Sequence, residues 1–118
     1  NNAIINLDKI IKNSDALLID RGDLSRYIPI EKIPVAQEKI INRSTKLKKP
    51  TYVATNLLES MIKENQPTRA ESHDVYSTLR EGAKGLVLAA ETAIGKNPIE
   101  CVRFIKRCIA VYKKNKNK

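Results

Sequence analysis

The sequence predicts an α/β protein with three parallel strands and flanking helices in the order α-β-α-β-α-β-α. Short apolar runs alternate along the chain with longer stretches whose apolar residues recur at helical spacing. The three apolar runs are almost uninterrupted, which is typical of strands in a buried parallel sheet. With 118 residues, 42% of them hydrophobic, the chain is long enough to bury a core.

The first predicted helix covers residues 6–13. Its apolar face consists of Leu7, Ile10 and Ile11. The first strand is predicted over residues 16–20, an apolar run that ends in the charged turn Arg21-Gly22-Asp23.

The second helix is predicted over residues 31–47, with Pro34 in the first turn, where proline is tolerated. Its apolar face consists of Ile33, Ala36, Ile40 and Ile41. Lys49-Pro50 breaks the helical pattern, and the second strand is predicted over residues 51–55.

The third helix begins at a capping box, because Thr68 and Glu71 have the Thr-x-x-Glu spacing. Gly82 is placed to end this helix. The third strand is predicted over residues 85–90.

The last helix opens at Asn97-Pro98, with asparagine as N-cap and proline at the first helical position. Its apolar face is predicted to consist of Val102, Ile105, Ile109 and Tyr112. Residues 103–118 carry seven of the 22 basic residues and none of the 13 acidic ones. No aromatic platform or nucleic-acid motif accompanies these cations, so we expect a solvated helix end and tail and no nucleic-acid partner.

Cys101 and Cys108 lie seven residues apart in a helical segment, about 10 Å along the axis. A disulfide requires Cα atoms within about 7 Å, so we expect two reduced thiols, as in a reducing compartment. His73 is the only histidine, which excludes a cluster of histidine metal ligands within this chain. No apolar run reaches about 18 residues, and we expect no membrane span.

Three strands alone make an incomplete sheet, because both edges are open and both faces are apolar. If the strands form part of a barrel wall, helices cover one face of the sheet, and the inner face packs against partner strands. A complete (β/α)₈ barrel takes about 250 residues. We therefore interpret residues 1–112 as a sector of such a barrel and residues 113–118 as a basic Lys/Asn tail.

Polar clusters follow all three predicted strands. They are Arg21-Gly22-Asp23, Thr55-Asn56 and Glu91-Thr92. Ligands bind at the C-terminal ends of strands in parallel α/β folds. Gly22 lets the backbone approach a ligand closely. If a short helical turn starts there, its N–H groups would hold an anion, and Asp23 could then place an oxygen on Mg²⁺. The residues alone thus suggest an anion and Mg²⁺ site.

Each candidate residue also has a simpler explanation. Asp23 can cap an ordinary turn, Thr55 can be a β-branched strand residue, and Glu91 can cap the turn that follows it. Arg69, at the start of the third helix, either contacts a partner surface or is solvated. Spacing alone leaves both explanations open.

Five motifs extend this interpretation. They are Asp20 to Leu24, Ala54 to Lys63, Pro67 to Glu71, Asp74-Val75, and Glu91 to Gly95. In order and without detectable gaps, they resemble the pyruvate kinase family over about residues 1–107. The resemblance covers the C-terminal part of that family's catalytic barrel, from its fifth helix to its eighth.

The resemblance implies transfer of the phosphoryl group of phosphoenolpyruvate to ADP, giving pyruvate and ATP in glycolysis, with Mg²⁺ and K⁺ as cofactors. It implies that Asp23 ligates Mg²⁺ and touches substrate. It also implies that the backbone of Gly22 and Asp23 holds the substrate carboxylate, and that Thr55 hydrogen-bonds substrate. Arg69 becomes a candidate for the subunit contact of a homotetramer.

The family's catalytic Lys and second metal-ligating Glu belong to a run whose Asn matches Asn1, so both are expected upstream of this sequence. No catalytic residue is therefore expected within the chain, and the isolated chain is expected to be inactive. The active protein would be a longer polypeptide that contains it. We expect a cytoplasmic enzyme, or an organellar one, such as a plastid enzyme, if a transit peptide lies upstream.

Some residues depart from the family pattern close to the expected site. Asp20 stands where the family usually has Ala, Asn56 replaces Gln, and Ala89-Ala90 replaces Ser-Gly. Farther away, Lys48 replaces the Gly that normally ends the preceding helix. The alternative is therefore a divergent pseudoenzyme or assembly module that keeps the barrel sector without catalysis.

Overall fold

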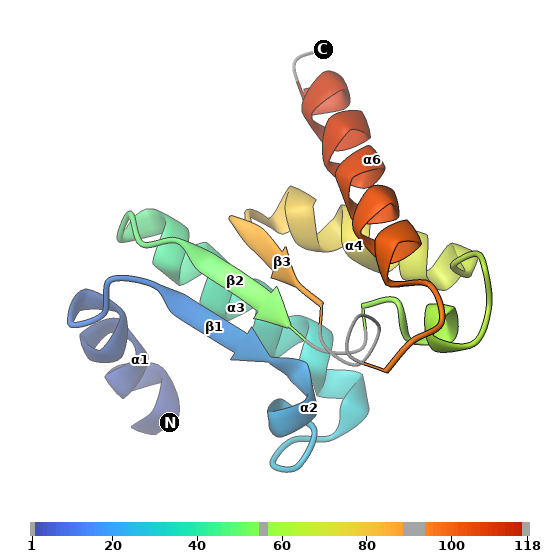
Figure 1. The fold of residues 1–118 in the computed structure, drawn as a ribbon. Helices are drawn as coiled ribbons and strands as arrows, with labels where there is room; N and C mark the ends of the chain where they lie inside the picture. The colour runs from blue at the N-terminus through green and yellow to red at the C-terminus, as the bar shows by residue number, and fades with distance from the viewer. Residues whose placement is uncertain (1, 55–56, 89–93, 117–118) are drawn as a thin grey trace.

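The computed structural model describes residues 2–54, 57–88 and 94–116, and it has the predicted alternation of helices and strands (Figure 1). Two 3₁₀ turns, η1 and η2, and one short helix, α2, add to the predicted elements. The elements are α1 (Asn2–Lys12), β1 (Leu17–Asp20), α2 (Arg21–Leu24), η1 (Ile30–Lys32), α3 (Ile33–Lys46), β2 (Thr51–Ala54), η2 (Glu59–Ile62), α4 (Arg69–Glu81), β3 (Gly85–Val87) and α6 (Pro98–Lys116).

The three strands form one parallel sheet in the order β1-β2-β3, as predicted. β3 ends at Val87, so it is shorter than the predicted strand, and residues 89–90 of that prediction lie outside the described residues. The Cα register aligns one row of Ile19, Val53 and Leu86, and a neighbouring row of Leu18, Tyr52 and Gly85. Because side chains alternate along a strand, these two rows face opposite sides of the sheet.

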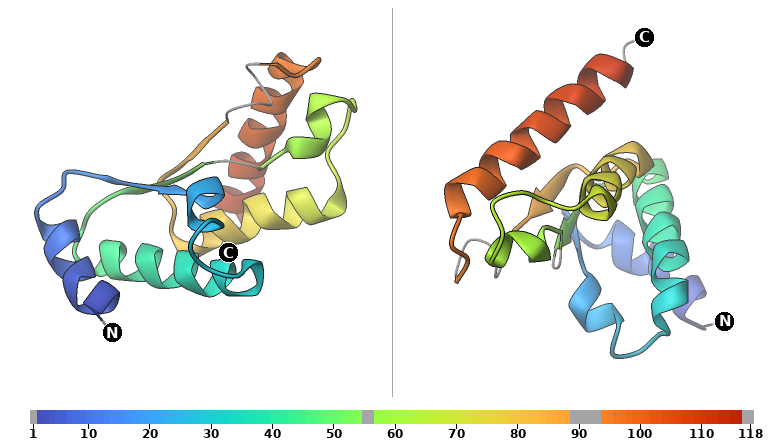
Figure 2. Two further views of the ribbon diagram at one scale, coloured as in Figure 1. Left: turned by 90° about the horizontal axis from the view of Figure 1, so that it is seen from below. Right: turned by 90° about the vertical axis from the view of Figure 1, so that its right-hand side faces the viewer.

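The helices α1, α3 and α4 lie on the same side of the sheet (Figure 2, left). On the other side Leu18 is 61% exposed and Val87 is 40% exposed. Tyr52 lies close over Gly85, where an added Cβ would come within 2.8 Å of the tyrosine ring. A sheet with one covered face, one open apolar face and two open edges is what a sector of a barrel wall requires. The predicted fold class is confirmed in this respect.

Two clusters of buried side chains form the core. The smaller lies between the sheet and α3 and consists of Ile19, Ile41 and Val53. The larger joins α4, α6 and the residues after β2, and consists of Leu57, Leu58, Met61, Val75, Leu79, Cys101 and Ile105. The residues after β2 are therefore part of the hydrophobic core, although they belong to no long helix or strand.

Two predicted helix faces need correction. Ile10 is 56% exposed, whereas Ile11 is fully buried, so the inner face of α1 is narrower than predicted. In α6 the predicted Val102 is 42% exposed, and its neighbour Cys101 is buried instead. Cys101 lies four residues before Ile105 and Val102 lies three before it, so both spacings fit one helix face, and the packing against the core buries Cys101.

Two helices end in the same hydrogen-bond pattern on different residues. After α4, Gly82 has a φ of 119°, as expected for a C-terminal glycine. After α3, the N–H of Lys48 donates to Thr45 O and that of Lys49 donates to Ser44 O, which is a Schellman motif. Lys48 occupies its left-handed position with a φ of 61°. A residue with a Cβ is strained there.

The helix α6 continues to Lys116, four residues past the predicted boundary at 112. Side chains on α4 hold this last turn: Asn115 Nδ2 donates to Tyr76 Oη at 2.9 Å, and the Tyr76 and Tyr112 rings meet edge to face at 6.0 Å. Much of the predicted basic tail is therefore helical. Both cysteines are free thiols, as predicted. Among the described residues, no helix is long and apolar enough to cross a membrane.

Candidate functional site

The C-terminal ends of the three strands lie side by side, because the register aligns Asp20, Ala54 and Val87. The three predicted polar clusters directly follow these ends or lie a few residues beyond them. Only the first cluster can be described. Thr55-Asn56 and Glu91-Thr92, as well as Ala89-Ala90, lie outside the described residues, so their roles stay predictions.

Residues 21–29 follow β1 and are called the first segment. They begin with the short helix α2, so the chain does form a helical turn at Gly22 and Asp23. Asp20 is its N-cap, and Asp20 Oδ1 accepts the N–H of Asp23 at 3.2 Å. Ser25 Oγ donates to Gly22 O at 2.7 Å. Asp20 therefore occupies a backbone N–H that an anionic ligand was expected to use.

The Asp23 side chain is 66% exposed, and the guanidinium of Arg26 lies 4.0 Å from its carboxylate. Asp23 and Asp20 also line a hollow of about 320 Å³ beside β1, together with Leu18 and Tyr27. An exposed carboxylate fits Mg²⁺, which is commonly held by one or two carboxylates, water and substrate phosphates. The described residues contain no cluster of three or more potential metal ligands.

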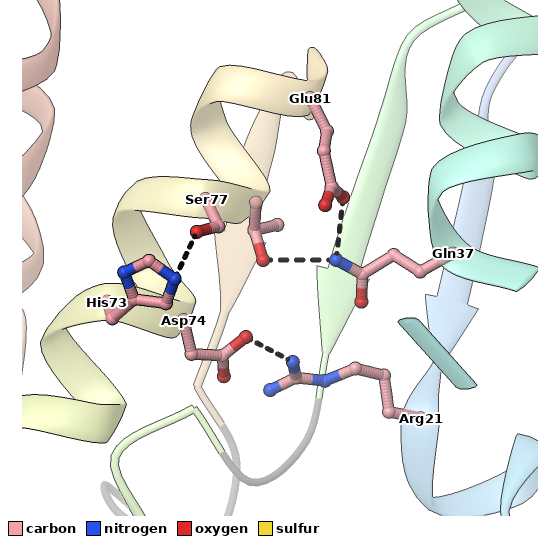
Figure 3. Close-up of polar contacts among 7 residues, drawn as sticks. Arg21, Gln37, His73, Asp74, Ser77 and Glu81 are labelled. Carbon is pink, nitrogen blue, oxygen red and sulfur yellow. Dashed lines mark hydrogen bonds and ion pairs between the residues drawn. The ribbon is translucent and has the colours of Figure 1, made fainter. Parts of the chain in front are cut away.

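Arg21 connects the first segment to α4. Arg21 Nη1 donates to Asp74 Oδ1 at 2.7 Å, and the two side chains are 14% and 32% exposed. Figure 3 shows the guanidinium pointing toward Asp74. Sequence reasoning assigned no role to Asp74, because the pair is separated by 53 residues.

Residues 57–67 follow the described end of β2 and are called the second segment. Glu71 on α4 holds it: one carboxylate oxygen accepts the Ser60 N–H at 2.7 Å, and the other accepts the Ser60 hydroxyl. The same carboxylate accepts the Thr68 N–H at 2.9 Å, and Thr68 Oγ1 accepts the Glu71 N–H, so the predicted capping box is confirmed. Burial raises the pKa of Glu71, but hydrogen bonds from Ser60 and Thr68 outweigh it and lower the pKa overall.

Further along α4, polar side chains join it to α3 (Figure 3). The buried Gln37 amide donates to Thr78 Oγ1 at 3.1 Å and to Glu81 Oε1 at 2.9 Å. His73 Nε2 lies 3.2 Å from Ser77 Oγ on the exposed side. The two hydrogen bonds of Gln37 fix α4 against α3, whereas the His73–Ser77 contact lies within α4. The groove beside them is lined by Glu38, Asn42, His73, Ser77, Arg80 and Glu81.

Arg69, the predicted subunit contact, is the first residue of α4 and is exposed. It lies two residues before Glu71 and five before Asp74. The helix that holds both segments therefore begins at the candidate contact residue.

Comparison with known proteins identifies the family. Residues 1–102 match the family described as the barrel domain of pyruvate kinase. The chain is 46% identical over 105 residues to the pyruvate kinase of Thermotoga maritima, covering 89% of this chain and 22% of that protein. It is 49% identical over 103 residues to a chloroplastic pyruvate kinase, isozyme G, of Ricinus communis, covering 87% of this chain and 25% of that protein.

A solved structure agrees with both relatives. The crystal structure of a pyruvate kinase from Cryptosporidium parvum superposes with a TM-score of 0.91 at 42% identity, over 95% of this chain and 23% of that one. The chain thus spans about a quarter of the length of the relatives that it matches. By sequence and by fold, the chain belongs to the pyruvate kinase family, within its barrel domain.

Proposed function

We propose that the full-length polypeptide carrying this chain transfers the phosphoryl group of phosphoenolpyruvate to ADP, giving pyruvate and ATP in glycolysis. One observation carries the proposal: in a chain of the pyruvate kinase family, the exposed Asp23 carboxylate lies directly after the C-terminal end of β1. This is the edge of a parallel barrel at which substrates bind.

Phosphoryl transfer depends mainly on positioning and on neutralising charge. In the proposed site, Asp23 contributes a carboxylate oxygen as a ligand for Mg²⁺. The backbone around Gly22 and Asp23 is proposed to hold the substrate carboxylate, and Thr55, which follows β2 in the sequence, is proposed to hydrogen-bond substrate. Mg²⁺, when bound, supplies positive charge against the oxygens of the transferred phosphoryl group. K⁺ is expected as a second cofactor.

The proposed site needs residues that this chain does not supply. β1 is an edge strand of the described sheet, so its free edge can pair with a further strand. We propose that this preceding strand carries the catalytic Lys and the second metal-ligating Glu. The isolated chain is then inactive. Arg69, exposed at the start of α4, is suitably placed for a subunit contact in a homotetramer.

The test is pyruvate formation by the full-length polypeptide from phosphoenolpyruvate and ADP, with and without Mg²⁺. Asp23→Asn keeps the size of the side chain and removes its charge. We expect this change to lower kcat/KM by at least about 100-fold, since a metal ligand is lost. Asp15→Asn, at an exposed carboxylate before β1, is the matched control and should behave as wild type. An active protein that is indifferent to Asp23→Asn would contradict the assignment.

One observation favours the alternative, an assembly module without catalysis. Asp20 places a carboxylate on the Asp23 N–H, next to where an anionic substrate is proposed to bind. A folded full-length polypeptide without turnover would support this alternative. If Asp20→Ala then restored binding of phosphoenolpyruvate, Asp20 would be the cause.

A further inference from the structure

The ion pair between Arg21 and Asp74 differs from an ordinary surface pair. Exposed pairs contribute little, because water screens them and two long side chains must be ordered. Here the Arg21 side chain is only 14% exposed, and its Nη1 lies 2.7 Å from Asp74 Oδ1. Figure 3 shows it extending from the first segment to α4. The pair therefore fixes one element against another.

Arg21 immediately precedes the residues proposed to bind ligand. The helix α2 has only four residues, and it is followed by residues that are largely exposed. Neighbouring Cα atoms lie about 3.8 Å apart, so a shift at Arg21 is passed directly to Gly22 and Asp23. The position of the Asp23 carboxylate thus depends on the contact that Arg21 makes with α4.

The same helix also holds the second segment. Glu71 accepts the Ser60 N–H and hydroxyl, and Asp74 accepts the Arg21 guanidinium, three residues farther along α4. Residues three apart lie on one face of a helix. One face of α4 therefore sets the spacing between the two segments that follow β1 and β2.

We propose that Asp74 is a positioning residue for the phosphoryl transfer proposed above, and the inference rests on that function. Through Arg21 it keeps Gly22 and Asp23 in register with the segment after β2. Asp74 itself contacts no substrate. Misplacing a reacting group by about 1 Å can cost about 100-fold in rate, so a small displacement of the first segment is sufficient.

The experiment compares variants of the full-length polypeptide by kcat, KM for phosphoenolpyruvate and thermal midpoint. Asp74→Asn removes the charge at constant size. Asp74→Glu and Arg21→Lys keep both charges and move the contact, so they remain informative if Asp74→Asn fails to fold. We expect kcat/KM to fall about 10- to 100-fold in Asp74→Asn, with partial recovery in Asp74→Glu. Asp15→Asn again serves as the exposed control.

A double-substitution cycle isolates the pair. The variant carrying both Arg21→Gln and Asp74→Asn should be no slower than the slower single variant, since both changes break the same contact. If the losses of kcat/KM in the two single variants multiply in the double variant, the proposal is wrong. A fall in thermal midpoint with unchanged kcat/KM would also overturn it, because a structural role alone explains that result. Absence of turnover in wild type would instead contradict the proposed function, and with it this inference.

Discussion

The segments that follow β1 and β2 are attached to the molecule in opposite ways. The first segment is largely exposed, with Tyr27 at 83%, and its Arg21 is bound to Asp74 on α4. The second segment buries Leu57 and Leu58 completely in the larger core cluster. Both segments contact the same helix, yet only the second contributes large apolar side chains to a fully buried cluster.

The helix α4 therefore has two roles, one in stability through the second segment and one in positioning the first segment. Changes in the second segment should act mainly on the free energy of unfolding, because its apolar side chains fill the core. Changes in the first segment should act mainly on the geometry of the proposed site, since little buried surface depends on them. α4 supplies both attachments from carboxylates three residues apart, Glu71 and Asp74.

The largest expected effect compares one large side chain from each segment. Leu58→Ala should lower the free energy of unfolding by about 3 kcal/mol, since a fully buried side chain leaves a cavity. Tyr27→Ala should change it by no more than about 0.5 kcal/mol. Denaturant unfolding of the full-length polypeptide measures both. Equal losses of unfolding free energy in the two variants would contradict the proposed difference between the segments.

The next effect concerns pH and Glu71. The pKa of Glu71 in the folded protein lies below its ordinary value of 4.5, so the carboxylate stabilises the fold at higher pH. That contribution is complete above the unfolded pKa and is lost as pH falls through the lower, folded pKa. Glu71→Gln should therefore cost about 1 kcal/mol near neutral pH and progressively less below about pH 4.5.

Unfolding measured from pH 7 to pH 3 checks this prediction. Glu59→Gln, at an exposed carboxylate of the second segment that Glu71 holds, is the control. A difference between wild type and Glu71→Gln that stays constant with pH would show that the carboxylate charge is not involved.

The smallest expected effect distinguishes a change in the stability of the protein from a change in the position of the site residues. Lys48→Gly places glycine at the left-handed position that ends α3, as Gly82 does after α4. Relief of backbone strain exceeds the entropic cost of glycine, and stability should rise by about 0.5 kcal/mol. Combined with Asp74→Asn, it should raise the thermal midpoint without restoring turnover. Restored turnover would indicate that Asp74 acts through stability alone.

Local patterns predicted the elements well. The Thr68–Glu71 capping box, Gly82 and Pro34 follow from short spacings, and all three hold in the structure. Ile105, Ile109 and Tyr112 contribute to the inner face of α6 as predicted. Only its first position was wrong, because the adjacent residues Cys101 and Val102 are both apolar. Both residues fit the apolar periodicity of the helix, so the sequence pattern does not distinguish them.

Long-range polar contacts were beyond prediction. Hydrophobic patterning gives no reason to bury Gln37 or Ser44, yet both lie on the inner face of α3 with hydrogen-bond partners. Likewise, Asp74 belongs to a recognisable motif, but its partner Arg21 comes close only when β1 and α4 are assembled. The polar turn after β1 was predictable, whereas the contact that holds it was not.

In the proposed site, the exposed Asp23 carboxylate after β1 helps to bind Mg²⁺ and an anionic substrate. Calorimetric titration of the full-length polypeptide with phosphoenolpyruvate, with and without Mg²⁺, tests it most directly. We expect Mg²⁺-dependent binding that weakens by at least about tenfold in Asp23→Asn and persists in Asp15→Asn. Binding of equal strength in wild type and Asp23→Asn, at every Mg²⁺ concentration, would contradict it.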